Sequence, residues 1–259
     1  MAWARHSGAT LGANVAGPGT SWNAGNLGAT PNANERVIAV VDVNSGGSQP
    51  TVTGITDSAG NAWTKDGSIQ PAGFGYFEEL SVWSCVANGS AVNNLTVAIS
   101  YSGSQGTPGA GISVGTYSGL STATGAGAAV DISKFSSGSN SFTADSGTTS
   151  GTTTGANELK IGAGSDAGNT LTYTAGTVDT TYSNFIKNDA NGNSETAIED
   201  ADSGASGSTA RAEFTFGAGS ANYCMGVLVY KLAAAGGPDL NAFPGEPQTG
   251  SSPIQGGLR

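Results

Sequence analysis

Short apolar runs separated by turn-forming residues recur along almost the whole chain, which is the pattern of a β-sandwich or barrel. Some runs are nearly continuous and β-branched, as in "RVIAVVDV" (36–43). No segment of ten or more residues keeps a 3.6-residue apolar period, and glycine at this density would weaken a helix by about 1 kcal/mol per site. The pattern predicts strands at 36–43, 51–56, 79–87, 94–101, 111–117, 157–163, 211–216 and 222–232.

The two halves of the chain resemble each other weakly. "NANERVIAVVD" (32–42) resembles "GANELKIGAGS" (155–165). Each half then closes with a strand that contains tyrosine, "AGISVGTYSGL" (110–120) and "NYCMGVLVYKL" (222–232). Because the order of these segments is the same in both halves, we expect two similar strand sets rather than a solenoid.

The fold class that follows is all-β, a jelly-roll-like antiparallel β-sandwich with extended N- and C-terminal arms. We assign residues 31–232 to the sandwich, in pseudo-repeated halves 31–120 and 143–232 that face each other. Two tandem small domains joined by 121–142 are the alternative.

Residues 1–30 and 233–259 are the predicted arms, the second one rich in glycine and proline. Arms of this kind can extend the area with which a subunit contacts its neighbours. Packing back on the same domain is the alternative for the C-terminal arm. The candidate partner-binding residues in the arms are Trp3, Trp22, Leu240, Phe243, Ile254 and Arg259.

Composition narrows the choice of partner. The chain has 42 glycines among 259 residues, 11% charged residues and a net charge of −10. Nucleic-acid binding needs a basic patch, and the nine basic residues are spread along the chain, so we expect no nucleic-acid partner. No apolar run approaches the length of a membrane span, and the N-terminus lacks the apolar region of a secretory leader. We therefore expect that the chain does not associate with a membrane and that it is synthesised and assembled in a cytoplasm.

The two cysteines, Cys85 and Cys224, each lie in an apolar strand-like run. Two buried thiols that act as small hydrophobic groups are the simpler interpretation. A disulfide between them stays open, because the sequence does not place their strands side by side.

Two acidic stretches are candidate calcium sites. "GITDSAGNAWTKDG" (54–67) lacks the ligand spacing of an EF-hand, so we interpret it as a hairpin turn that Asp57 caps, with positive φ at Gly60 and Asn61. "NDANGNSETAIEDADSG" (188–204) lacks a calcium-binding repeat as well, and an exposed acidic face or loop is its simpler interpretation. We expect no cofactor, with calcium as the alternative.

Catalysis has little support. The one histidine, His6, falls in the predicted N-terminal arm, where a preorganised Ser-His-Asp or Cys-His arrangement is hard to build. No phosphate loop is present, and pairs of glutamates such as Glu195 and Glu199 occur in any acidic β-protein. We therefore predict that the chain is not an enzyme.

Aromatic residues in "PAGFGYFEE" (71–79) are candidates for surface recognition. Phe74, Tyr76 and Phe77 lie in a glycine-rich context, where exposed rings can stack on sugars. Packing in the core or in a subunit contact is the alternative.

Several segments together resemble a β-sandwich module of tailed-bacteriophage virion proteins and some bacterial surface proteins. They are "TDSAGNAWT" (56–64), "LSVWSCVANGSAVNNLTVAIS" (80–100), "ISVGTYSGL" (112–120), "GTTTGANELKIGAG" (151–164) and "MGVLVYKL" (225–232). The resemblance covers about residues 30 to 232 and implies a fold and a setting, with no functional residues carried over.

The expected function is that of a virion structural protein, a capsid decoration (cement) protein that binds the major capsid protein or other virion proteins. We expect a homo-oligomer, for which a trimer would suit quasi-threefold capsid positions. A tail, fibre or baseplate component that contacts the host, by way of glycans, is the first alternative. A secreted carbohydrate-binding or hydrolytic domain is the second.

Overall fold

The computed structural model describes residues 2–11, 20–71, 77–104, 109–166, 172–176, 182, 184–188, 195–217 and 221–234. All regular elements in these residues are β-strands, and every pairing between them is antiparallel. The all-β sandwich class is therefore confirmed. The described part contains no helix that could cross a membrane.

The first half of the chain holds eight strands. They are β1 (Ala4–Leu11), β2 (Ser21–Gly25), β3 (Arg36–Ser45), β4 (Pro50–Thr56), β5 (Thr64–Ile69), β6 (Phe77–Val86), β7 (Leu95–Tyr101) and β8 (Gly109–Ser118). They form a five-stranded sheet with the order β1-β8-β3-β6-β5 and a three-stranded sheet with the order β2-β7-β4.

The second half repeats this arrangement. Its strands are β9 (Val130–Ser141), β10 (Thr143–Asp145), β11 (Leu159–Asp166), β12 (Tyr173–Ala175), β13 (Asn184–Asn188), β14 (Glu195–Asp202), β15 (Glu213–Phe216) and β16 (Ala221–Tyr230). They form a five-stranded sheet, β13-β14-β11-β16-β9, and a three-stranded sheet, β10-β15-β12. Adding eight to each strand number of the first half gives the strand orders of both sheets in the second half.

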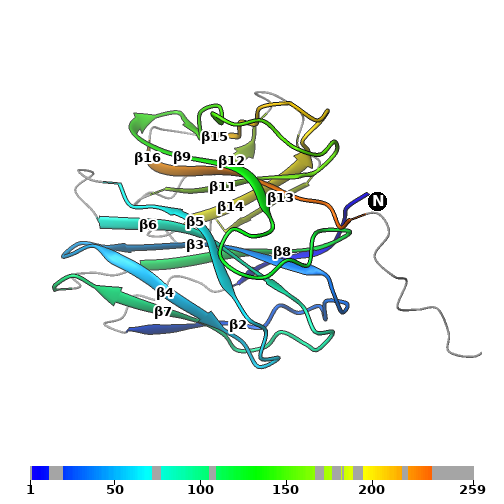
Figure 1. The fold of residues 1–259 in the computed structure, drawn as a ribbon. Coiled ribbons are helices and arrows are strands. Elements are labelled where there is room, and N and C mark those ends of the chain that lie inside the picture. Colours follow the sequence, from blue (N-terminus) through cyan, green and yellow to red (C-terminus); the bar gives the residue numbers. More distant parts are fainter. Residues whose placement is uncertain are drawn as a thin grey trace, which may run out of the picture.

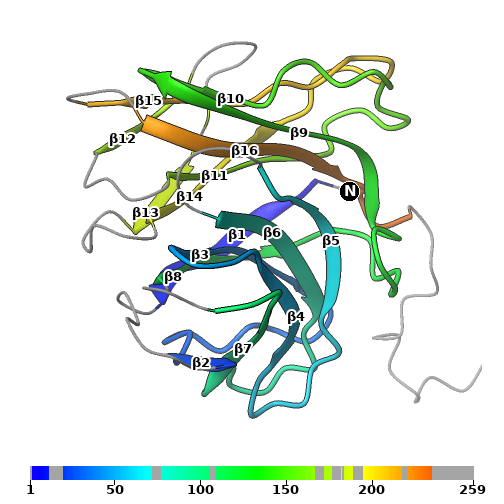
Figure 2. The ribbon, with the colours of Figure 1, turned by 90° about the vertical axis from the view of Figure 1, so that its left-hand side faces the viewer.

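The four sheets are stacked as four layers, with the two five-stranded sheets in the middle (Figures 1 and 2). Each half is thus a sandwich of its own, and the two sandwiches face each other through their larger sheets. In both halves the fifth strand joins the larger sheet, as β5 does by pairing with β6. The jelly-roll connection remains an interpretation from the sequence.

Each interface between layers has its own hydrophobic core. Alternation along β3 sends Val37 and Val41 toward the three-stranded sheet of the first half, whereas Ile38 and Val40 face the second half. The cluster between the halves also contains Leu80, Ile161, Ile198 and Leu228, all 0% exposed. A third cluster, around Phe214 and Val227, fills the second sandwich. Because the inner strands of the larger sheets are covered on both faces, apolar residues are continuous in β3 and β16.

Many glycines lie inside strands rather than in loops, and several make room for an aromatic ring. A Cβ at Gly138 would lie 2.6 Å from the ring of Tyr223, and a Cβ at Gly226 would lie 2.5 Å from the ring of Phe135. The same Phe135 ring also covers Gly67 of the first half. Glycine therefore sets the close approach of neighbouring strands and sheets in this fold.

The predicted N-terminal arm is wrong for the part of it that the structure describes. β1 pairs with β8, and β2 pairs with β7, so residues 4–11 and 21–25 belong to the two sheets of the first half. β1 is an edge strand of mainly polar and small residues. Backbone hydrogen bonds hold it in the sheet, so its sequence shows no apolar pattern. The predicted C-terminal arm lies outside the described residues beyond Ala234.

Candidate functional site

Both ends of the described chain leave the molecule at one corner. The Ala233 amide donates to the Gly119 carbonyl over 2.9 Å, and Leu120 forms an antiparallel bridge with Leu232. Gly119 has a φ of 75°, and a Cβ there would overlap the carbonyl of Ala2. In Figure 1 the N-terminal residues and the chain that follows β16 meet on the right-hand side. Whatever follows Ala234 therefore starts next to the N-terminus.

Trp3 lies at this corner and joins the two halves. Its Nε1 donates to Asp202 Oδ1 over 2.8 Å, and its ring meets that of Tyr117 edge-on, with centroids 6.2 Å apart. Its apolar part packs against the cluster between the halves. The structure thus gives this predicted partner-binding residue an intramolecular role.

Trp22 is not available to a partner in this fold. It is 5% exposed and belongs to the core of the first sandwich. The alternation of exposed and buried residues along β2 turns its ring inward, and two apolar positions in so short a segment are too few to predict a strand. Its prediction as a partner-binding residue is therefore corrected.

Phe77 is 43% exposed at the start of β6, and Phe142, which the sequence did not single out, is 65% exposed after β9. Both lie at the far end of the molecule from the chain ends. For Phe142, β9 starts near that corner and its 12 residues span roughly 40 Å. Phe77 pairs with Ser45, at the end of β3 that lies away from Arg36. Phe74 and Tyr76 lie outside the described residues, as do Leu240, Phe243, Ile254 and Arg259.

Polar side chains fix the two halves to each other. Tyr117 Oη and Arg5 Nη1 of the first half donate to Asp200 Oδ2 of the second, over 3.1 and 3.4 Å. In return, Tyr230 Oη of the second half donates to Asp66 Oδ2 over 2.8 Å. Burial, more than the nearby Asp200 charge, raises the pKa of Tyr117 well above its usual value, so this hydroxyl keeps its proton and stays a donor.

Arg36 holds the segment that connects the two halves. Its guanidinium donates to the carbonyls of Ser121 (3.1 and 2.6 Å) and Ala123 (2.7 Å) and to Ser84 Oγ (2.8 Å). Arg36 is 3% exposed. Burial lowers its pKa, while nearby Tyr230 and Asp66 act in the opposite direction.

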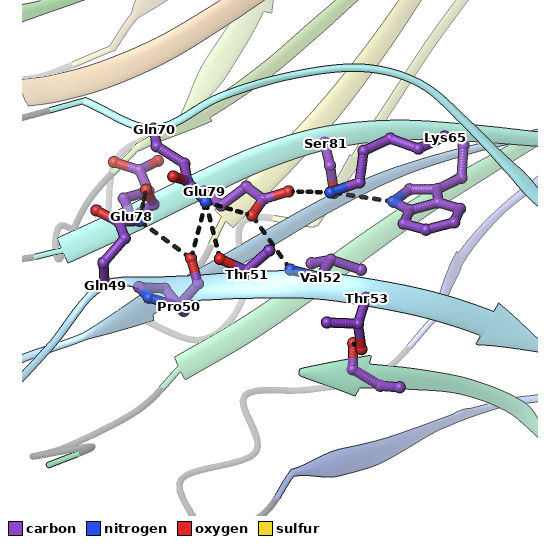
Figure 3. Close-up of polar contacts among 12 residues, drawn as sticks. Gln49, Pro50, Thr51, Val52, Thr53, Lys65, Gln70, Glu78, Glu79 and Ser81 are labelled. Atoms are coloured by element: carbon purple, nitrogen blue, oxygen red, sulfur yellow. Dashed lines mark hydrogen bonds and ion pairs between the residues drawn. The ribbon is translucent and has the colours of Figure 1, made fainter. Parts of the chain in front are cut away.

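A second buried polar network closes the gap between β4 and β6, which belong to different sheets (Figure 3). Glu79, 0% exposed, accepts from Lys65 Nζ (2.7 Å) through Oε1. Its Oε2 accepts from the Val52 amide (3.1 Å) and from Gln70 Nε2 (2.8 Å). Lys65 Nζ also lies 5.2 Å from the centre of the Trp83 ring. The network supplies donors and acceptors at a point where β4 and β6 form no ladder.

We expect Glu79→Gln to lower the free energy of unfolding by about 3 kcal/mol, because an amide cannot accept from three donors and leaves Lys65 without its counter-charge. Urea unfolding would measure the loss. Thr53→Ala removes an exposed hydroxyl that donates to the Ala98 carbonyl in the same region and should change stability by less than about 0.5 kcal/mol. Equal effects of the two substitutions would contradict the role given to Glu79.

The segment 54–67 contains a turn between the end of β4 and the start of β5, and Asp57 is its cap. Asp57 Oδ2 accepts from Trp63 Nε1 (2.6 Å) and Asn61 Nδ2 (3.1 Å), and Gly60 has a φ of 70°. The predicted positive φ at Asn61 is absent from the structure. The predicted hairpin is wrong as well, because β4 and β5 lie in different sheets and the turn carries the chain from one to the other.

The acidic stretch 188–204 is not an exposed face where the structure describes it. Residues 195–202 form β14, an inner strand of the larger sheet, in which Glu195, Glu199 and Asp200 are 0% exposed. Glu199 Oε2 accepts from the Gly176 amide over 2.9 Å, and Asp200 accepts from Tyr117. The sequence could not reveal this burial, since the donors come from distant strands.

One group of buried carboxyl groups spans both halves, and we call it the acid cluster: Asp42, Glu78, Asp166 and Glu195, all 0% exposed. Asp166 and Glu195 are directly opposite each other on β11 and β14. Ser165 Oγ of the second half donates to Glu78 Oε1 of the first over 2.5 Å. Burial raises the pKa of Glu78, against hydrogen bonds with Ser165, Asp42 and Cys224 that act to lower it.

His6 lies at a bulge of β1, not in an arm. Its Nδ1 is 2.7 Å from Glu35 Oε2, and Glu35 also accepts from the amide and side chain of Asn32. Burial acts to raise the pKa of Glu35, but the hydrogen bonds from Asn32 and His6 outweigh it and lower the pKa. Hydrogen bonds thus hold the Glu35 carboxylate beside His6, and the sequence did not predict this contact.

Cys85 and Cys224 are free and buried, as in the simpler interpretation of the sequence. They lie in different cores, one in the first sandwich and one between the halves. Within the described ranges, no group of three or more His, Cys, Asp or Glu side chains has the arrangement of a metal site.

Comparison with known proteins gives no relative. No family model, no curated protein and no solved structure matches this chain. The resemblance to a bacteriophage virion module therefore stays an expectation based on the motifs quoted above.

Proposed function

We propose that this chain is a non-enzymatic structural protein of a bacteriophage virion and that it decorates the capsid as a cement protein. The observation that carries the proposal is the common exit of both chain ends from one corner of a body held by three cores. A body attached at that corner can bind a shell through its chain ends and project its far end outward.

The surface chemistry supports the same assignment. Only 11% of the residues are charged, and serine, threonine, asparagine and glycine dominate strands such as β9, "VDISKFSSGSNS". Short side chains lose little conformational entropy when they form wide polar contacts, which favours assembly into a shell. We propose the major capsid protein as the partner and a homo-oligomer, a trimer at quasi-threefold positions, as the bound form.

Deletion of residues 235–259 tests the proposal. Capsids assembled without this protein would be mixed with the full chain or the shortened chain and sedimented. We expect the deletion to weaken binding at least about tenfold, because the removed segment starts at the corner that would face the shell. Phe142→Ala, at the far end, is the matched control and should bind as the full chain does. Unchanged binding after the deletion would count against attachment through the C-terminal segment.

The second candidate function is that of a tail or fibre component that contacts host glycans, and the exposed ring of Phe77 at the far end favours it. A glycan array probed with the full chain and with Phe77→Ala tests this candidate. A sugar signal that disappears in the variant would support it over the cement role.

A further inference from the structure

The outer side of β9 is the longest open strand edge in the described part of the molecule. β9 is the last strand of the second larger sheet and forms a ladder with β16 alone. Figure 2 shows it at the margin of its sheet, with no further strand beyond it. Apart from that ladder, the described residues offer no backbone hydrogen-bond partner to residues 131–140. Alternate residues of β9 therefore point free N–H and C=O groups away from the sheet.

The other edge strands are interrupted or short. β1, β2, β4 and β5 each contain a bulge, and β10, β12 and β13 have at most five residues. β9 keeps an uninterrupted register with β16 over the seven residues from Ile132 to Gly138, whereas no other edge strand that the structure describes does so for more than five. Bulges and short length are the devices that keep an edge from pairing with another chain. Over this stretch β9 has neither device.

The side chains of β9 suit pairing with an identical strand. Residues 132–141 read "ISKFSSGSNS", with five serines and Lys134 as the one charged residue. A chain with a net charge of −10 repels a second copy of itself, so a contact between copies is favoured where acidic groups are absent. In an antiparallel pair centred on Ser136, Lys134 lies opposite Gly138 of the second copy. No like charges then face each other across the pair.

A second β9 satisfies this edge better than the C-terminal segment of the chain does. Antiparallel pairing about a twofold axis lets the same outward N–H and C=O groups serve both copies. The C-terminal segment starts nearby, since the Lys231 amide donates to the Ala129 carbonyl over 2.9 Å just before β9. Proline cannot donate to a ladder, however, and residues 235–259 contain Pro238, Pro244, Pro247 and Pro253.

We propose that two copies of this chain associate through their β9 edges, antiparallel to each other across a twofold axis. The contact joins two five-stranded sheets into one continuous sheet of ten strands. It is a contact in solution that goes beyond the proposed function and does not depend on binding to a shell.

Sedimentation equilibrium of the full chain tests the proposal. We expect the mass to rise with concentration toward twice 25.4 kDa, with half of the chain dimeric at about 10 µM. Ser133→Glu/Ser139→Glu places like charges opposite each other and should weaken dimerisation at least about tenfold. Both side chains are exposed, so the variant should fold as the natural chain does. Thr56→Glu/Ser100→Glu, the matched control, adds the same charge at exposed positions of β4 and β7 and should dimerise normally.

A charge exchange shows whether the two strands contact each other directly. Ser133→Lys/Ser139→Lys should also be monomeric by itself, because like charges again face each other. When the glutamate and lysine variants are mixed in equal amounts, opposite charges meet across the axis and a mixed dimer should form. Native mass spectrometry would identify the mixed dimer by its mass. Its formation would also show that both variants are folded.

The proposal would be overturned by a constant mass of 25.4 kDa up to about 100 µM, or by an oligomer that neither β9 variant weakens. Equal weakening by the control at β4 and β7 would show a general effect of charge, and a failure to form the mixed dimer would rule out direct pairing of the two strands. Loss of the dimer after deletion of residues 235–259 would assign the contact to that segment instead. Capsid binding does not enter these measurements, so each of these results leaves the proposed function untouched.

Discussion

Replacing Gly164 by alanine should lower the free energy of unfolding by about 3 kcal/mol, because the added methyl group has no space. Gly164 lies in β11, at the centre of its sheet, and a Cβ there would overlap the ring of Phe214 and lie 3.1 Å from Met225 Sδ. Phe214 is 0% exposed, so its ring cannot move into solvent. Thermal and urea unfolding would measure the effect.

A double-mutant cycle isolates this contact. Phe214→Ala alone should cost about 4 kcal/mol through the lost ring and the cavity. The double variant Gly164→Ala/Phe214→Ala should be more stable than the sum of the two losses predicts, by about 1–3 kcal/mol, because the methyl group enters the vacated space. Gly54→Ala is the matched control, since a Cβ at that strand position meets no atom within 4 Å. A similar loss of stability in Gly54→Ala would mean that strand propensity, and not the contact with the Phe214 ring, determines the loss of stability in Gly164→Ala.

Replacing Arg36 by methionine should lower the free energy of unfolding by about 4 kcal/mol. The substitution keeps most of the apolar stem but removes the donors from the carbonyls of Ser121 and Ala123 and from Ser84 Oγ. Unfolding in urea would measure the loss, and proteolysis should cut the segment 121–129 earlier than in the natural chain, because Arg36 attaches this segment to β3.

Two further variants make the Arg36 experiment decisive. Arg36→Lys should lie between the natural chain and the methionine variant, since an ammonium group cannot reproduce the planar fork of donors. Lys134→Met removes an exposed positive charge from β9 and should change stability by less than about 0.5 kcal/mol. A lysine variant as stable as the natural chain would indicate that charge alone, rather than the hydrogen-bond geometry, holds the connecting segment.

All eight strands predicted from apolar runs are present, with ends shifted by a few residues, as for 36–43 against β3 (Arg36–Ser45). These strands lie next to a core, so burial imposes the pattern that made them visible. The missed strands lack such a pattern. β1, β5 and β9 are edge strands of mainly polar and small residues, and the inner strand β14 carries four acidic side chains in eight residues.

The sequence by itself determined the all-β class, the burial of the two cysteines, the Asp57 turn and a repeat between the halves, because each depends on patterns within short stretches of the chain. Only the tertiary structure decided which sheet each strand joins, that Trp22 points into the core, and that the acidic groups of β14 are buried. These outcomes depend on contacts between residues far apart in the chain, such as Tyr117 with Asp200, Ser165 with Glu78 and Phe214 with Gly164. The local hydrophobic periodicity of a sequence does not indicate which distant residues come into contact.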